Sequence, residues 1–263
     1  MSAATRPDPP VAAVPAERAD HYSYTAYADP RMAENFDRVR FGGPIGGLLL
    51  ETQERVLLEF LGDVRGREVL DVGTGTGRAA LTLARAGARV TGVDASGEML
   101  RVADDRARRE ALAITFQEGD AHALAFPDRS FDAAISLRVL MHTPDWRVCL
   151  GELCRVARER VVFDYPATAS VALLQSIGRR VGARLGRRVE AYRVFRQGEI
   201  VHQLERHGFE VRRVHRQFVL PIALHKVIGS RRATETIEGI LAAVGLLRLL
   251  GSPVTVVAER CRS

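Results

Sequence analysis

Three glycines spaced every second residue, Gly73, Gly75 and Gly77, separate a mostly apolar run at 69–72 from a helical pattern. The run is typical of a buried strand, so the glycines would form the turn between strand and helix. Glycine tolerates positive φ, and without a Cβ it lets backbone N–H groups approach a ligand closely. The helix start adds unpaired N–H donors. This stretch predicts a turn that binds a ligand with several polar groups.

Aspartates end the next two expected strands, Asp94 at 89–94 and Asp120 at 114–120. Asp94 could accept hydrogen bonds from both hydroxyls of an unphosphorylated ribose, and Asp120 could accept one from the exocyclic amine of adenine. The dinucleotide fingerprint G-x-G-x-x-G/A is not matched, because Arg78 occupies its third position. The spacing favours a nucleoside without a phosphate.

The elements that would position these residues alternate between strands and helices. Alternation of this kind implies right-handed crossovers and a parallel sheet that is covered on both faces. Ligands bind such sheets at the carboxyl ends of the strands, where the aspartates would lie. Strands are expected at 69–72, 89–94, 114–120, 131–137, 160–165, 209–218 and 254–258, and helices at 30–39, 48–61, 96–110, 146–156, 167–185, 197–207 and within 221–250. The glycine-rich stretch 41–47 lacks the Lys-Ser/Thr pair of a P-loop and is interpreted as a hinge between two helices.

The motifs D-V-G-T-G-T-G, G-V-D-A-S and G-D-A-H-A-L-A-F-P-D-R-S-F-D, in that order, resemble those of the class I S-adenosylmethionine-dependent methyltransferases. They are similar, more narrowly, to the small-molecule type 11 group that includes the quinone-biosynthesis methyltransferases. The resemblance covers 48–165 in good order. It implies a three-layer Rossmann-like α/β sandwich whose mostly parallel, seven-stranded sheet ends in an antiparallel strand pair. It also implies S-adenosylmethionine as cofactor and methyl transfer to a small molecule that is phenolic, quinone-like or lipid-like.

The resemblance also assigns cofactor contacts. The implied residues are Asp71, Gly73, Gly75 and Gly77 for the methionine part, Asp94, Ala95 and Ser96 for the ribose, Asp120 and Ala121 for the adenine, and Leu137 at the methyl-transfer site. Arg38 or Arg40 would reach the cofactor carboxylate. Purely structural roles stay open, because Asp94 or Ser96 could cap the following helix and Asp71 could tie down the glycine turn.

The methyl group on the sulfonium sulfur is already activated, so methyl transfer needs few catalytic side chains. Where the acceptor must lose a proton, a general base is needed. His142 follows the fourth strand, and its imidazole titrates near neutral pH. Asp164 and Tyr165, at the end of the fifth strand, are further candidates. Alternatively, each of these three residues could have only a structural role and order the loop in which it lies.

Composition and length bound the remaining expectations. The 263 residues carry a net charge of +6, but Lys226 is the only lysine, so the charge is a weak sign of a nucleic-acid face. Three cysteines without zinc-type spacing predict no metal site and favour a reducing cytoplasm. No apolar segment reaches the roughly 20 residues that span a bilayer. The arginine-rich stretch 179–188 could hold an anionic substrate or contact a membrane surface, or could be a solvated helix face.

We expect a disordered tail at 1–20, where prolines alternate with alanines, and one methyltransferase domain at 21–263. Its cofactor-binding core would be 48–165, with elements that cover the substrate at 21–47 and 167–250. Two other activities stay open. They are a methyltransferase acting on tRNA or rRNA, which lacks a D-P-P-Y type signature here, and a nicotinamide-dependent oxidoreductase, which Arg78 disfavours. A non-catalytic cofactor-binding subunit is a further alternative.

Overall fold

The computed structural model describes residues 29–170 and 192–261. The expected tail at 1–20 and the arginine-rich stretch 179–188 lie outside these residues. So does most of the expected helix at 167–185, whose first residues, 167–170, form a β-bridge and bends.

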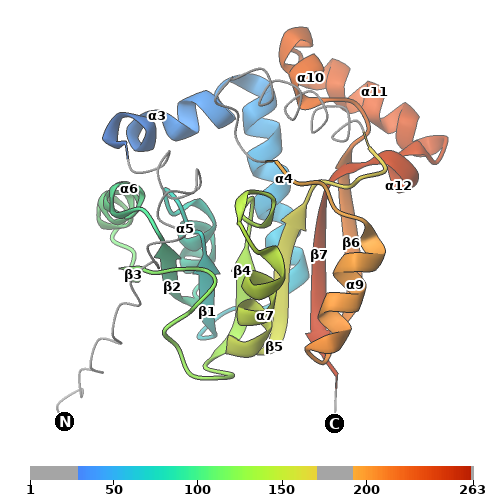
Figure 1. Ribbon diagram of the computed structural model, residues 1–263. Helices are drawn as coiled ribbons and strands as arrows, with labels where there is room; N and C mark the ends of the chain where they lie inside the picture. Colours follow the sequence, from blue (N-terminus) through green and yellow to red (C-terminus); the bar gives the residue numbers. More distant parts are fainter. Residues whose placement is uncertain (1–28, 171–191, 262–263) are drawn as a thin grey trace, which may run out of the picture.

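A seven-stranded sheet forms the centre of the molecule, in the order β3-β2-β1-β4-β5-β7-β6 (Figure 1). β1 to β5 run parallel, and β7 runs antiparallel to both of its neighbours, β5 and β6. The strands are β1 (Glu68–Val72), β2 (Arg89–Asp94), β3 (Ile114–Glu118), β4 (Phe131–Ser136), β5 (Ala157–Tyr165), β6 (Phe209–Phe218) and β7 (Ser252–Arg260). The predicted Rossmann-like sheet, with its antiparallel last pair, is confirmed.

Helices cover both faces of the sheet, as expected for parallel strands joined by crossovers. α4 and α5 pack on one face through Val56, Leu57 and Leu83, and α7 and α9 pack on the other through Trp146 and Leu204. The helices are α3 (Pro30–Phe41), α4 (Gly43–Leu61), α5 (Arg78–Arg85), α6 (Gly97–Arg109), α7 (Trp146–Val156), α9 (Gln197–Arg206), α10 (Ile222–Ile228), α11 (Arg231–Ala243) and α12 (Leu246–Leu250), with a 3₁₀ turn, η2, at Leu140–His142.

Two differences from the sequence-based expectations affect the end of the sheet where the aspartates lie. α4 begins at Gly43, so most of the expected glycine-rich hinge forms its first turns. Pro44 fits there because the first N–H groups of a helix have no intrahelical partner. β3 ends at Glu118, two residues early, which places Asp120 in the loop beyond the strand.

α3 and α10 to α12 lie at the end of the sheet where the parallel strands finish (Figure 1). A buried hydrogen bond between His225 and Glu238 joins α10 to α11, with 2.9 Å between Nε2 and Oε1. Glu238 also accepts hydrogen bonds from the backbone N–H groups of Val219 and Leu220. Among the helices in the described part of the chain, none is both long enough and apolar enough to cross a membrane.

The glycine turn allows a test of the packing behind it. Gly77 has φ of +79°, and a Cβ added there would lie 2.8 Å from the Cβ of Ala103 on α6. We expect Gly77→Ala to lower the free energy of unfolding by about 1–2 kcal/mol, since an L side chain disfavours this conformation. Urea denaturation measures the change.

Gly239→Ala is the matched control, because Gly239 lies within α11 and an added Cβ meets no atom within 4 Å. Alanine favours a helix over glycine, so this variant should be neutral or slightly more stable. Equal destabilisation of both variants would contradict the packing role of Gly77.

Candidate functional site

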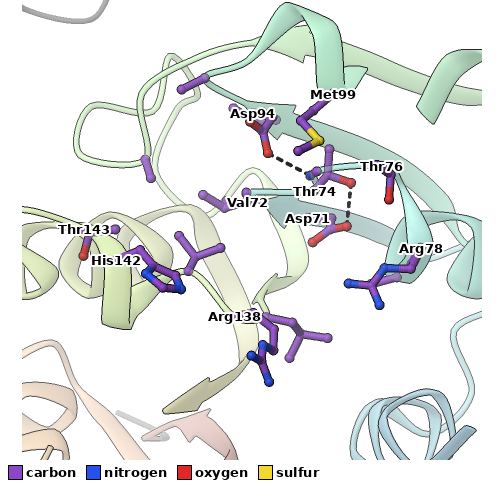
Figure 2. Close-up of a pocket in the computed structure, with 18 of the residues that line it drawn as sticks. Asp71, Val72, Thr74, Thr76, Arg78, Asp94, Met99, Arg138, His142 and Thr143 are labelled. Atoms are coloured by element: carbon purple, nitrogen blue, oxygen red, sulfur yellow. Dashed lines mark hydrogen bonds between the residues drawn. The ribbon is translucent and has the colours of Figure 1, made fainter. Parts of the chain in front are cut away.

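An open cleft of about 1020 Å³ lies at the carboxyl ends of β1, β2 and β4. β1 and β4 are adjacent in the sheet but not in sequence, so the chain order reverses between them. Crevices at such switch points are the usual ligand sites of this architecture. Figure 2 shows the labelled side chains around this cleft, with Asp94 and Met99 on one side of Asp71 and Arg138 on the other.

The glycine turn forms the floor of the cleft at the end of β1. Gly73 and Gly75 have φ of +72° and +54°, which glycine adopts without strain. A Cβ on Gly73 would lie 2.2 Å from Cγ2 of Val139, so the β4 loop also requires glycine there. The backbone N–H groups of Gly73 and Thr74 both donate to the carbonyl of Val93, which ties the turn to β2.

Asp71 is 2% exposed, and its carboxylate accepts a hydrogen bond of 2.7 Å from the hydroxyl of Thr74 (Figure 2). Burial, together with the negative charge of Asp94, raises the pKa of Asp71 to about 6, although the hydrogen bond from Thr74 opposes the shift. A carboxylate in this setting attracts a cationic ligand group.

Asp94 joins the two loops that border the cleft. Its Oδ2 accepts from the N–H of Gly75 at 2.7 Å, and its Oδ1 accepts from the N–H of Ser96 at 3.0 Å. Burial raises the pKa of Asp94, and these backbone bonds oppose the shift. Each carboxylate oxygen has a second lone pair, so Asp94 can accept two further hydrogen bonds from a ligand in the cleft.

Most of the predicted site residues meet in this one cleft. Those that line it are Asp71, Gly73, Gly75, Asp94, Ala95, Ala121, Leu137 and His142. Three predicted cofactor residues, Gly77, Ser96 and Asp120, do not line it. Gly77 packs against α6 instead, and the hydroxyl of Ser96 caps α6 by accepting from the N–H of Met99.

The carboxylate of Asp120 has a partner within the protein. It is fully buried, and its Oδ1 lies 2.7 Å from Nδ1 of His122 and accepts from the backbone N–H of the same residue. The neighbouring Gly119, Ala121 and His122 line the cleft in its place. The contact between Asp120 and adenine stays a prediction.

Of the candidate bases, His142 lines the cleft, whereas Asp164 lines a neighbouring cavity. His142 is buried in η2, and its ring packs edge-on against Tyr192 with 6.1 Å between centroids. Asp164 accepts a short hydrogen bond from the backbone N–H of Arg138, and burial raises its pKa. Tyr165 faces the other side of the sheet in the core with Trp146, and burial raises its pKa to about 12, so it is poorly placed as a base.

Two arginines in the cleft, Arg78 and Arg138, were not predicted as site residues. Arg78 stacks on Phe41 with 3.5 Å from its Cζ to the ring centroid, and its Nε lies 3.3 Å from Asp37. Burial lowers the pKa of Arg78 to about 10, and the charge of Asp37 opposes this. Its Nη1 is buried without a hydrogen-bond partner. Arg38 and Arg40, which were expected to reach the cofactor, do not line the cleft.

Asp37 holds α3 against the glycine turn. It accepts a 3.1 Å hydrogen bond from the hydroxyl of Thr76 and forms ion pairs with Arg78 and Arg106. Phe36, one residue earlier on α3, consequently lines the cleft. The spacing of Arg78 from the glycines was visible in the sequence, but its contact with α3 was not.

Comparison with solved structures shows how this fold is used elsewhere. Magnesium protoporphyrin IX methyltransferase from Synechocystis PCC 6803 with bound SAH is similar at a TM-score of 0.63 and 21% identity, over 90% of this chain and 99% of that one. The [4+2]-cyclase SpnF is similar at a TM-score of 0.58 and 23% identity, over 81% of each chain. These likenesses show the fold, and the cyclase shows that the fold alone does not fix a reaction.

Sequence comparison is more specific. Residues 70–163 match the family model described as a methyltransferase domain. This part of the chain is thus similar to a methyltransferase domain. Demethylmenaquinone methyltransferase from Tropheryma whipplei (strain Twist) is 38% identical to this chain over 130 residues, 49% of this chain and 51% of that protein. The chain thus spans about half the length of the curated relatives it matches, and the resemblance noted in the sequence is confirmed.

The raised pKa of Asp71 makes the stability of this protein depend on pH. Folded Asp71 binds a proton more tightly than the unfolded residue, so its contribution to stability is present below pH 4 and is lost as pH rises to about 6. An asparagine side chain at this position cannot titrate. We expect Asp71→Asn to gain stability relative to the wild type across this range, by up to about 3 kcal/mol.

Urea denaturation at several pH values measures the difference between Asp71→Asn and the wild type. Asp105→Asn, on the partly exposed surface of α6, controls for the loss of a carboxylate. A difference for Asp71→Asn that stays constant from pH 4 to pH 7 would show that burial does not perturb this group.

Proposed function

We propose that this protein binds S-adenosylmethionine in the cleft and transfers its methyl group to a small-molecule acceptor. The observation that carries the proposal is the position of Asp94. Its carboxylate is held by two backbone N–H groups at the end of β2, beside the glycine turn, with lone pairs left for two ribose hydroxyls. The family match and the names of the relatives support the same cofactor.

The remaining polar groups of the cleft fit the methionine part of that cofactor. The buried Nη1 of Arg78 has no protein partner and can donate to a carboxylate. Asp71 can attract an ammonium group, and its pKa would fall when that charge is near. Arg78, and not Arg38 or Arg40, is therefore the proposed carboxylate ligand.

S-adenosylmethionine would supply a methyl group that its sulfonium sulfur already activates. The chain's own contribution is then alignment and exclusion of water, which can account for most of the rate. Leu137 and Val139 form an apolar wall at the end of β4, and Phe36 covers the cleft from α3. His142 is the proposed base for an acceptor that must lose a proton.

A small acceptor fits the surroundings of the cleft. One relative is named a demethylmenaquinone methyltransferase, and one structural neighbour is named a magnesium protoporphyrin IX methyltransferase. These names support a ring-containing, phenolic or quinone-like acceptor. The proposed selecting elements are α3, the start of α4 and α10 to α12, which lie over the strand ends (Figure 1). Cys149 and Cys154 are buried free thiols, which supports a reducing cytoplasm.

Substitution of Asp94 tests the ribose contact. We expect Asp94→Asn to weaken binding of adenosine about 10- to 100-fold, the value of hydrogen bonds to a charged group. The wild type should prefer adenosine over 2′,3′-dideoxyadenosine, and the variant should lose most of that preference. Isothermal titration calorimetry measures both ligands on both proteins.

Glu118→Gln is the matched control, because Glu118 pairs with Asp94 across β2 and β3 but is exposed and outside the cleft. It should retain the preference for adenosine. Loss of affinity for both nucleosides to the same extent in Asp94→Asn would indicate collapse of the turn and not a lost ribose contact.

Methyl transfer itself requires a direct assay. Incubation of the protein with methyl-labelled S-adenosylmethionine and a metabolite extract should label one or a few small molecules, with Asp94→Asn as the inactive control. Label that appears only in an RNA fraction would support the alternative of a nucleic-acid methyltransferase. No transfer, despite binding of the cofactor, would favour a non-catalytic role.

A further inference from the structure

A second cavity of about 350 Å³ adjoins the cofactor cleft. Arg138 and Gln53 line both cavities, so the two meet at these side chains. Phe41, Leu49 and Val56 form its apolar wall, and residues of β5, β6 and β7 form its floor. This volume includes space that is open to the solvent.

The floor of this cavity interrupts an otherwise apolar contact between α4 and the sheet. Val162 on β5 lies opposite Val257 on β7, and both belong to the core beneath α4. Two residues further along β5 on the same face, Asp164 lies opposite Thr255, which in turn lies opposite His215 on β6. Polar side chains therefore stand in place of apolar ones where these strands approach the cofactor cleft.

Two polar groups in this floor have no partner among the residues that the structure describes. Nε2 of His215 and Nε2 of Gln217 are buried there and make no hydrogen bond. Leaving a buried polar group unpaired costs roughly 1–3 kcal/mol, and few such groups occur in native proteins. Their position in the floor of a cavity indicates that a ligand satisfies them.

Arg138 places a positive charge at the junction of the two cavities. Its φ is +65°, unusual for a residue other than glycine, and its backbone N–H donates to Asp164. Strained backbone of this kind is often found at functional sites. Within residues 29–170 and 192–261 its guanidinium forms no hydrogen bond and no ion pair, although the carboxylate of Asp164 lies near enough to interact with its charge.

We propose that the methyl acceptor is an organic acid whose anionic group binds Arg138 and whose body occupies the second cavity. His215 and Gln217 hydrogen-bond the polar groups of that body, and Phe41, Leu49 and Val56 pack on its apolar part. This assignment rests on the proposed function, and it names the substrate class of the same site.

The other ionisable groups around the cavity are compatible with an anion. Burial raises the pKa of Asp164, which weakens its repulsion of a second negative charge, and Arg138 opposes this shift. Burial also lowers the pKa of His215, as does the positive charge of Arg55, so the ring is neutral at pH 7 and can hydrogen-bond without a charge. Glu59 opposes that shift but forms an ion pair with Arg213.

A carboxylate at Arg138 could also come from the methionine part of the cofactor, because Arg78 and Arg138 lie on the same side of Asp71 in the cleft (Figure 2). S-adenosylhomocysteine carries that carboxylate, whereas 5′-methylthioadenosine lacks it. We expect Arg78→Gln to reduce the preference for S-adenosylhomocysteine about tenfold or more, and Arg138→Gln to leave it unchanged. The opposite result would assign Arg138 to the cofactor and overturn the proposal.

Binding of acid probes tests the acceptor site itself. The probes are benzoate, 4-hydroxybenzoate and octanoate, each paired with its neutral amide, titrated into the protein saturated with S-adenosylhomocysteine. At least one acid should bind about tenfold or more tightly than its amide, and Arg138→Gln should abolish that difference. Arg31→Gln, which removes an exposed arginine on α3, should leave it intact.

Gln217→Leu provides a second variant, since it removes one unpaired donor without breaking a protein hydrogen bond. This variant should bind the acid more weakly than the wild type does, and its affinity for S-adenosylhomocysteine should be unchanged. The proposal is overturned if no acid binds, if amides bind equally well, or if Arg138→Gln retains the difference. A protein that does not bind S-adenosylhomocysteine at all would instead contradict the proposed function.

Discussion

The hydrogen bond from the N–H of Gly75 to the carboxylate of Asp94 is the contact on which the site depends. It spans 2.7 Å and connects the turn after β1 to the end of β2. Asp94 is thereby fixed with lone pairs directed at the cleft, and the turn keeps a conformation that only glycine adopts readily. The same contact gives Asp94 a structural role, and this role is compatible with the ribose contact that we propose for it.

Buried charged groups surround this contact and would complement the charges of a ligand. Asp71 is held in the core with a raised pKa, and Arg78 keeps one buried N–H group without a partner. These features cost stability in the empty protein and are recovered when complementary charge binds. α3 closes over them because Asp37 pairs with Arg78 and Arg106. The cofactor cleft and its cover are thus one electrostatic unit.

Local patterns predicted the parts of this site that one stretch of chain encodes. The glycine spacing and the strand ending at Asp94 led to the cleft at the carboxyl ends of β1, β2 and β4, because turn and strand signals act over a few residues. Asp120 was expected at the end of a strand but lies in the loop beyond it, because β3 stops at Glu118, and its carboxylate lies 2.7 Å from the ring of His122. Arg138 and the polar floor under α4 come from segments that are far apart in the sequence, some by more than 100 residues. No local spacing in the sequence predicts that these segments meet.

A crystal structure with S-adenosylhomocysteine tests the central claim most directly. The account predicts ribose hydroxyls within hydrogen-bond distance of both oxygens of Asp94, adenine beside Ala121, and the carboxylate at Arg78, with the second cavity still open at Arg138. Ribose bound away from Asp94, or a ligand seated outside the cleft formed by β1, β2 and β4, would contradict it.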